Sequence, residues 1–155
     1  RVISSSYLRK LILKGKVKEA DTYLSFPFTI LGRVIKGQGL GSILGFPTAN
    51  LTVENEIIPA FGVYTVKARF SKKVFMGLCY IGDRPTFKTN HLSKKTSFEI
   101  HILDFKKSLY GKKIEVEFVK RLRPQNKFSN LQKLVEQIKK DIKKARHFLS
   151  TSTLL

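Results

Sequence analysis

The hydrophobic residues of the chain change their spacing twice. Across residues 4–24 apolar positions recur at helical spacing, which predicts two short helices broken at Gly15. From Phe28 every second position is apolar, the period of a strand with one buried face. From Leu131 onward the helical spacing returns. The pattern therefore predicts a helical start, a β-rich middle and a closing helix.

The β-rich middle divides into five or six short strands. After residues 28–36, alternating stretches with many β-branched and aromatic residues occupy residues 62–70, 74–81, 96–103 and 114–119. The turn-like sequences SKK and YGKK separate some of them. Short strands joined by tight turns are typical of an antiparallel sheet or a small barrel, so we expect a mainly β fold.

The closing segment has the pattern of an amphipathic helix of about five turns. Ser129 or Asn130 precedes it and is a candidate N-cap. The apolar stripe is expected to lie against the barrel and consists of Leu134, Val135, Ile138, Ile142 and Ala145.

The chain is strongly basic. Among 155 residues, 30 Lys and Arg face 11 Asp and Glu, a formal net charge of +19. One interpretation is a basic small-barrel module that binds RNA or single-stranded DNA. The other is a lysine-rich surface together with a site for an anionic small molecule. The basic residues are spread along the whole chain, and the aromatic residues mostly alternate into the expected core. Both observations favour the second interpretation, with no specific nucleic-acid partner.

Length and cysteine content suggest where the chain works. A length of 155 residues suits one domain with a short appendage. The lone cysteine, Cys79, cannot form an internal disulfide, which fits a reducing cytoplasm. No apolar run reaches the roughly 18 residues that a membrane-spanning helix needs, so we expect no membrane partner. The first residue is Arg1 rather than methionine, so we expect a piece of a longer protein.

A glycine-rich loop precedes an extended segment. Gly37, Gly39 and Gly41 match the beginning of a dinucleotide-binding fingerprint, but that fingerprint needs a helix directly after the glycines. Here Pro47 follows in a β-like segment, and the Gly-Lys-Ser/Thr of a Walker loop is missing. The glycines either contact a phosphate through their backbone amides or merely permit a hairpin turn.

Thr48 and Asn50 form a second candidate element of the site. They are two residues apart, so in an extended segment both side chains point to the same side. A hydroxyl and an amide oxygen can hold Mg²⁺ or another divalent ion whose remaining ligands are phosphate oxygens and water. The alternative is ordinary turn chemistry, which threonine and asparagine often supply.

Six motifs together are similar to the riboflavin kinase family. In order they are GRVIKGQGLGSILGFPTANL, GVY, IGDRPTF, FEIHILDF, LYGKKIEVEF and LRPQNKF, and with the final helix they span residues 28–149. The resemblance implies a six-stranded antiparallel Greek-key β-barrel with a C-terminal amphipathic helix. It also implies an enzyme that transfers the γ-phosphoryl group of ATP to the 5′-hydroxyl of riboflavin, giving ADP and FMN.

The resemblance assigns roles to particular residues. Glu99 is expected to be the catalytic base, and Thr48 and Asn50 the metal ligands. In a strand, Glu99 points away from Phe98 and Ile100 and alongside His101. The remaining assignments are Gly37, Gly39, Gly41, Pro47 and His101 to ATP and its phosphates, and Arg84 and Arg123 to flavin.

Each of these assignments has a structural alternative. Glu99 is alternatively a solvent-facing strand carboxylate, and His101 a histidine that packs across strands. Arg84 and Arg123 are alternatively turn residues that only contact solvent. Two positions also depart from the family pattern: Ser42 follows Gly41 where the family commonly has arginine, and Tyr80 stands where it often has asparagine.

The N-terminal segment resembles part of a different domain. ISSSYLR, residues 3–9, is similar to the motif that closes a nucleotidyltransferase domain, which precedes the kinase in bacterial bifunctional FAD synthetases. The expected division is a helical linker at residues 1–24, a kinase domain at 25–150 and a flexible tail at 151–155. The nucleotidyltransferase domain is an expected partner. We therefore expect this chain to make FMN but not FAD, and residues 1–20 to be dispensable for kinase activity.

Overall fold

The structure is a computed structural model that describes residues 4–36, 45–86 and 93–152, with the side chains of 84–86, 93–95 and 149–152 outside the description. The elements in chain order are α1 (Ser5–Leu13), α2 (Val17–Asp21), β1 (Thr29–Ile35), β2 (Ala49–Val53), β3 (Gly62–Phe70), β4 (Lys73–Thr86), β5 (Ser93–Ile102), β6 (Lys113–Arg123) and α4 (Leu131–Ser152).

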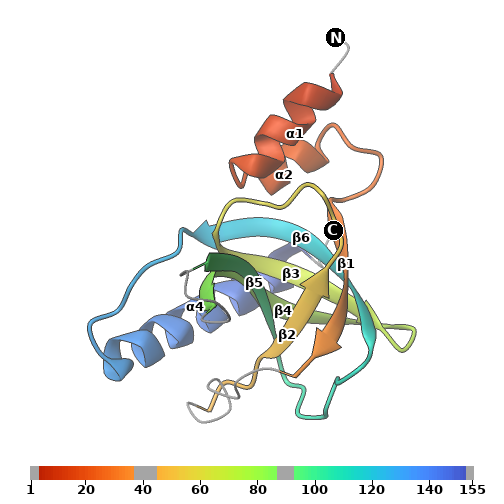
Figure 1. Cartoon of the computed structure of the whole chain (residues 1–155). Helices are drawn as coiled ribbons and strands as arrows, with labels where there is room; N and C mark the ends of the chain where they lie inside the picture. Colours follow the sequence, from red (N-terminus) through yellow and green to blue (C-terminus); the bar gives the residue numbers. More distant parts are fainter. Residues whose placement is uncertain (1–3, 37–44, 87–92, 153–155) are drawn as a thin grey trace.

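The six strands close into an antiparallel barrel. Their spatial order is β1-β2-β5-β4-β3-β6, and β6 pairs with β1 to complete the ring. Because β6 returns to lie beside β3, the order β6-β3-β4-β5 is a Greek key. Figure 1 shows α1 and α2 (red) at one end of this barrel and α4 (blue) along its side. The fold expected from the sequence is therefore confirmed.

Some strand boundaries follow from local turn geometry, and others depend on pairing between distant residues. Ser71 and Lys72 link β3 to β4 with φ angles of 51° and 59°, the left-handed geometry of a tight hairpin turn. β4 and β5 run longer than the alternation predicts, because their far halves pair with each other as far as Thr86 and Ser93. This pairing is a long-range interaction that the local pattern does not show.

The barrel interior is filled by side chains that alternate along the strands. Tyr64 and Phe118 are fully buried there, with their rings edge to face at 5.2 Å. Val17 of α2 is also fully buried and joins the same core. The helical segment is therefore more than an appendage, and deleting residues 1–20 would remove a side chain from the barrel core.

Helix α4 packs on the outer face of β3 and β4. Ala145 is fully buried against Val63 and Leu78, as the predicted apolar stripe requires. The predicted N-cap is Asn130, whose Oδ1 accepts a hydrogen bond from the backbone N–H of Lys133 at 2.9 Å. The helix continues to Ser152, two residues into the segment expected to be a tail; residues 153–155 lie outside the described residues.

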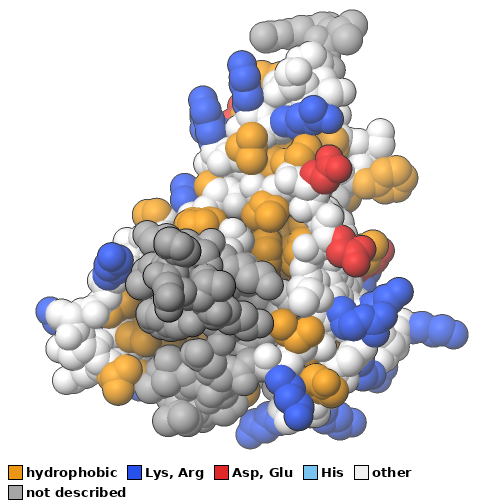
Figure 2. Space-filling view, in the orientation of Figure 1, with side chains coloured by type: hydrophobic (Ala, Val, Ile, Leu, Met, Phe, Trp, Pro, Cys, Tyr) orange, Lys and Arg blue, Asp and Glu red, His pale blue; other side chains and the backbone are white. Residues whose placement is uncertain are grey.

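Figure 2 shows one face of the molecule, on which Lys and Arg side chains lie around the margins with apolar side chains between them. In the part of the chain that the structure describes, no helix is long and apolar enough to cross a membrane.

Candidate active site

Two cavities share Thr48 in their linings. The helix-side cavity, of about 300 Å³, lies between the outer face of β4 and β5, residues 123–128 and the start of α4. The lysine-lined cavity, of about 520 Å³, is lined by residues 34–36, 47–49 and 105–110 together with Ile100 and Ile102. Thr48 is therefore the boundary residue of both cavities.

Strand register brings three functional side chains into one row. Asn50 of β2 lies opposite Glu99 of β5, which lies opposite Tyr80 of β4. Residues paired in this way project to the same face of an antiparallel sheet. The neighbours Phe98 and Ile100 are 5% and 1% exposed in the barrel core, so the row lies on the outer face. Glu99 therefore points away from the core and alongside His101, as the alternation predicted, and both line the helix-side cavity.

Thr48 and Asn50 flank an inward-facing residue. Ala49, between them, packs against the barrel core, so the two polar side chains share the outer face with Glu99. Asn50 is only 7% exposed. The described residues contain no group of three or more His, Cys, Asp or Glu suited to a metal ion. A divalent cation here would depend on the neutral oxygens of Thr48 and Asn50 with Glu99 close by, a hard-oxygen set that suits Mg²⁺.

His101 fixes the segment that carries Thr48. Its Nδ1 lies 2.8 Å from the carbonyl oxygen of Pro47, and its ring meets Phe46 edge to face at 6.4 Å. A carbonyl oxygen only accepts, so Nδ1 carries the proton in this hydrogen bond. Pro47 and His101, both assigned to the nucleotide, are thus in direct contact.

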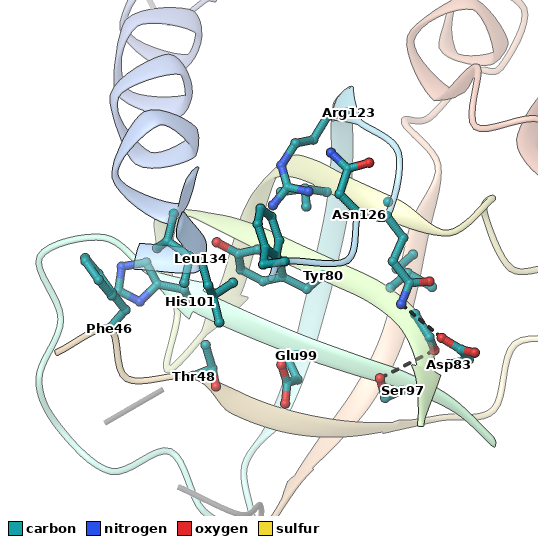
Figure 3. Close-up of a pocket in the computed structure, with 17 residues that line it drawn as sticks. Phe46, Thr48, Tyr80, Asp83, Ser97, Glu99, His101, Arg123, Asn126 and Leu134 are labelled. Atoms are coloured by element: carbon teal, nitrogen blue, oxygen red, sulfur yellow. Dashed lines mark hydrogen bonds between the residues drawn. The ribbon is translucent and has the colours of Figure 1, made fainter. Parts of the chain in front are cut away.

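The helix-side cavity has an apolar wall and a polar end. Figure 3 shows Phe46, Tyr80 and Leu134 around its inner part, with Asp83 and Ser97 at the far end of β4 and β5. Gln125 donates to Asp83 Oδ1 at 3.0 Å, and Ser97 Oγ donates to the Gly82 carbonyl oxygen at 3.4 Å. Such a cavity suits a flat ring with polar atoms along one edge.

Burial strengthens the hold of Tyr80 on its phenolic proton. Removal from water raises the pKa of its phenol above the ordinary value, and the nearby carboxylate of Asp141 acts in the same direction. The phenol can donate a hydrogen bond at neutral pH, as any tyrosine can, and keeps its proton to a higher pH than an exposed one. Asparagine, which the family often has at this position, would also supply a donor, so the substitution keeps that capacity.

Arg123 lines the cavity, and Asp141 of α4 binds its guanidinium. Its Nε and Nη2 donate to the two carboxylate oxygens of Asp141 at 2.9 and 2.8 Å, and its Cζ lies 5.7 Å from the centre of the Phe128 ring. Asp141 is not among the residues predicted from the sequence. A signal was available, because Asp141 falls between Ile138 and Ala145 on the apolar stripe, where a charged residue needs a buried partner.

A family model supplies the decisive comparison. The flavokinase model, described as riboflavin kinase, matches residues 24–149. The chain belongs to the riboflavin kinase family. It is 41% identical over 149 residues to the bifunctional riboflavin kinase/FMN adenylyltransferase of Bacillus subtilis, covering 96% of this chain and 47% of that protein. The protein of the same name in Haemophilus influenzae is 38% identical, also with 96% and 47% covered. The chain thus spans about half the length of the curated relatives it matches.

Two solved structures share the fold of this riboflavin kinase family member. One, reported as a macrolide-efflux protein from Streptococcus pneumoniae, has a TM-score of 0.85 at 34% identity, covering 93% of this chain and 46% of that one. The riboflavin kinase of Trypanosoma brucei has a TM-score of 0.54 at 22% identity, covering 79% of each chain. The second likeness extends to the fold alone.

Several assignments fall outside the described residues. Gly37, Gly39, Gly41 and Ser42 belong to the range 37–44, and the side chain of Arg84 is likewise not described. Their roles stay predictions from the family resemblance. Among the described residues, Asp83, Gln125 and Phe128 line the cavity without having been assigned as site residues.

Proposed function

We propose that this chain is a riboflavin kinase domain that transfers the γ-phosphoryl group of ATP to the 5′-hydroxyl of riboflavin. One observation carries the proposal: Thr48 lines both an apolar cavity with a polar end, which Glu99 also lines, and a second cavity lined by lysines. Phosphoryl transfer depends mainly on positioning and charge neutralisation, and this arrangement provides a place for each substrate and a shared boundary.

The two cavities divide the substrates by their chemistry. The isoalloxazine ring of riboflavin belongs in the helix-side cavity, where Tyr80, Phe128 and Leu134 offer apolar and aromatic contacts. The triphosphate of ATP belongs in the lysine-lined cavity, beside Lys36, Lys106 and Lys107. The ribityl chain would then extend from the ring toward Thr48, and its 5′-hydroxyl would approach Glu99.

Glu99 acts as the base in this arrangement. Its carboxylate takes the proton of the 5′-hydroxyl as the new bond from that oxygen to the γ-phosphorus forms. The bond from the γ-phosphorus to the bridging oxygen breaks, and ADP leaves with the electron pair. A divalent cation bound by Thr48 and Asn50 would neutralise phosphate charge. His101 holds the Pro47 carbonyl and so keeps Thr48 at the boundary of the two cavities.

The wider context is part of the same proposal. The bifunctional relatives support an N-terminal nucleotidyltransferase domain that precedes this chain in the complete protein. The lone Cys79 supports a cytoplasmic location. Residues 1–24 then act as the connection between the two domains.

The direct test is product formation. The chain is incubated with riboflavin and excess MgATP, and the flavins are separated by chromatography. We expect FMN and ADP in equal amounts and no FAD. Unchanged riboflavin under conditions where the chain is folded would refute the kinase proposal, and an FAD peak would refute the expected division of activities.

A further inference from the structure

Two arginine–aspartate pairs of similar geometry connect α4 to the barrel, and they differ in their exposure to water. Arg123 donates to both oxygens of Asp141 at 2.9 and 2.8 Å, and Arg146 donates to both oxygens of Asp104 at 2.8 Å. The side chains of Arg123 and Asp141 are 13% and 1% exposed, whereas those of Arg146 and Asp104 are 50% and 74% exposed. Only the first pair is shielded from water, where removal of one partner is costly.

The buried pair joins the elements that enclose the helix-side cavity. Arg123 ends β6 and begins the segment that carries Gln125 and Phe128, while Asp141 lies one turn after Ile138 of α4. Gln137 donates to Asp141 Oδ1 at 3.0 Å and so orients the carboxylate within its own helix. Figure 3 shows the Arg123 side chain extending from the end of β6 toward the cavity.

Asp141 also determines what Arg123 presents to a ligand. A guanidinium has five N–H groups. Nε and Nη2 each donate one to Asp141, and Nη1 donates one to the Pro124 carbonyl oxygen at 3.3 Å. Among the described residues, the other two N–H groups have no hydrogen-bond partner. The pair of Arg123 and Asp141 has no net charge, but the Arg123 guanidinium still offers hydrogen-bond donors. Such donors suit the carbonyl edge of a neutral ring better than they suit an anion.

We propose that Asp141 is a positioning residue for riboflavin: it fixes and neutralises the Arg123 guanidinium and holds α4 at the distance that the flavin ring requires. The inference rests on the proposed function. Asp141 also raises the pKa of Tyr80, which lines the cavity, so the carboxylate lies close enough to act on a second cavity residue besides Arg123.

The test compares Asp141→Asn with Asp104→Asn, which changes the exposed pair. Riboflavin binding is measured by quenching of flavin fluorescence without nucleotide, and the KM values for riboflavin and MgATP are measured at a temperature well below unfolding. We expect Asp141→Asn to raise the Kd and KM for riboflavin by about tenfold or more, since a misplacement of about 1 Å can cost about 10²-fold. The KM for MgATP should not change, and Asp104→Asn should change neither KM.

A second variant separates positioning from stability. Arg123→Met combined with Asp141→Leu replaces the buried pair by apolar side chains, which often restores stability. We expect its Tm to approach that of the parent chain while the KM for riboflavin stays raised. If riboflavin affinity recovers together with Tm, or if Asp141→Asn raises both KM values equally, the pair has only a structural role.

A parent chain that binds no riboflavin would overturn the proposed function as well, whereas normal riboflavin binding in both the parent and Asp141→Asn overturns this inference alone.

Discussion

The two cavities that share Thr48 are built in different ways. In the helix-side cavity the polar groups are held by partners within the chain: Arg123 by Asp141, Asp83 by Gln125, and His101 by the Pro47 carbonyl. In the lysine-lined cavity the charged groups are the exposed ammonium groups of Lys36, Lys106 and Lys107. We therefore expect the helix-side cavity to recognise its ligand by fixed geometry and the lysine-lined cavity to attract its ligand by charge.

This difference matches the demands of the two proposed substrates. A neutral flavin ring offers little charge, so its binding depends on shape and on donors already in place. A triphosphate is attracted from any direction by lysines, which are flexible point charges. The difference predicts that substitutions in the helix-side cavity change the KM for riboflavin and that substitutions in the lysine-lined cavity change the KM for ATP. Substitutions at the boundary between the cavities should change kcat.

Glu99→Gln tests the boundary and should have the largest effect. The substitution keeps size and polarity but removes the base, which is typically worth about 10²–10⁴-fold. We expect kcat to fall within that range while both KM values change little. Steady-state kinetics measure all three quantities. The matched control is Glu115→Gln, an exposed strand carboxylate on β6, which should leave turnover unchanged. Normal turnover in Glu99→Gln would show that Glu99 is not the catalytic base and is only a solvent-facing carboxylate.

Thr48→Ala and Asn50→Ala test the metal pair. Each should weaken MgATP binding by at least about tenfold, since even the partners of metal ligands are worth about 10–100-fold in affinity. The double variant should be only slightly worse than either single one, because both residues serve one ion. Calorimetric titration with MgATP provides the measurement, and Thr52→Ala in the same strand is the control. Parental MgATP binding in both single variants would show that the pair only shapes the turn.

The lysine-lined cavity should respond to charge and salt. Replacing Lys106 and Lys107 together by glutamine should raise the KM for ATP by about tenfold, since exposed ionic contacts contribute up to about 1 kcal/mol each. The difference should shrink as salt screens the charges, and the KM for riboflavin should stay constant. The same change at Lys143 and Lys144 on α4 removes equal charge away from both cavities. An equal rise of the ATP KM in that control would mean that only the net charge of +19 matters.

The sequence predicted the parts of the site that depend on local geometry. Alternation along a strand placed Glu99 and His101 on one side and Phe98 and Ile100 on the other, and the burial of the latter pair confirms it. Helical spacing likewise predicted the stripe that ends in buried Ala145. Such features follow from the period of a single element and need no partner to be known.

The parts that were missed depend on pairing between distant segments. The pairing of β2 with β5, which sets Asn50 opposite Glu99, joins residues far apart in the chain. The partnership of Arg123 with Asp141 and the place of Val17 in the barrel core are of the same kind. Composition and period do not specify which distant side chain fills a given position. The prediction that residues 1–20 are dispensable for kinase activity did not take into account the contact of Val17 with the barrel core, and it stays a prediction.

Tyr80→Phe should have the smallest effect and tests whether the helix-side cavity recognises riboflavin by single fixed donors. It removes one hydroxyl from the cavity wall while keeping the ring, so we expect the KM for riboflavin to rise about threefold, the value of one neutral hydrogen bond. The KM for ATP should not change. Burial raises the pKa of Tyr80 above the ordinary value of about 10, so the folded chain keeps this proton at pH values where an exposed tyrosine loses it. The threefold ratio between parent and variant should therefore be the same at pH 7 and at about pH 10.5, where an exposed tyrosine is mostly ionised. A ratio that falls toward one at the higher pH would show that the phenol ionises there and that water reaches it, which would contradict the burial of this hydroxyl in the helix-side cavity.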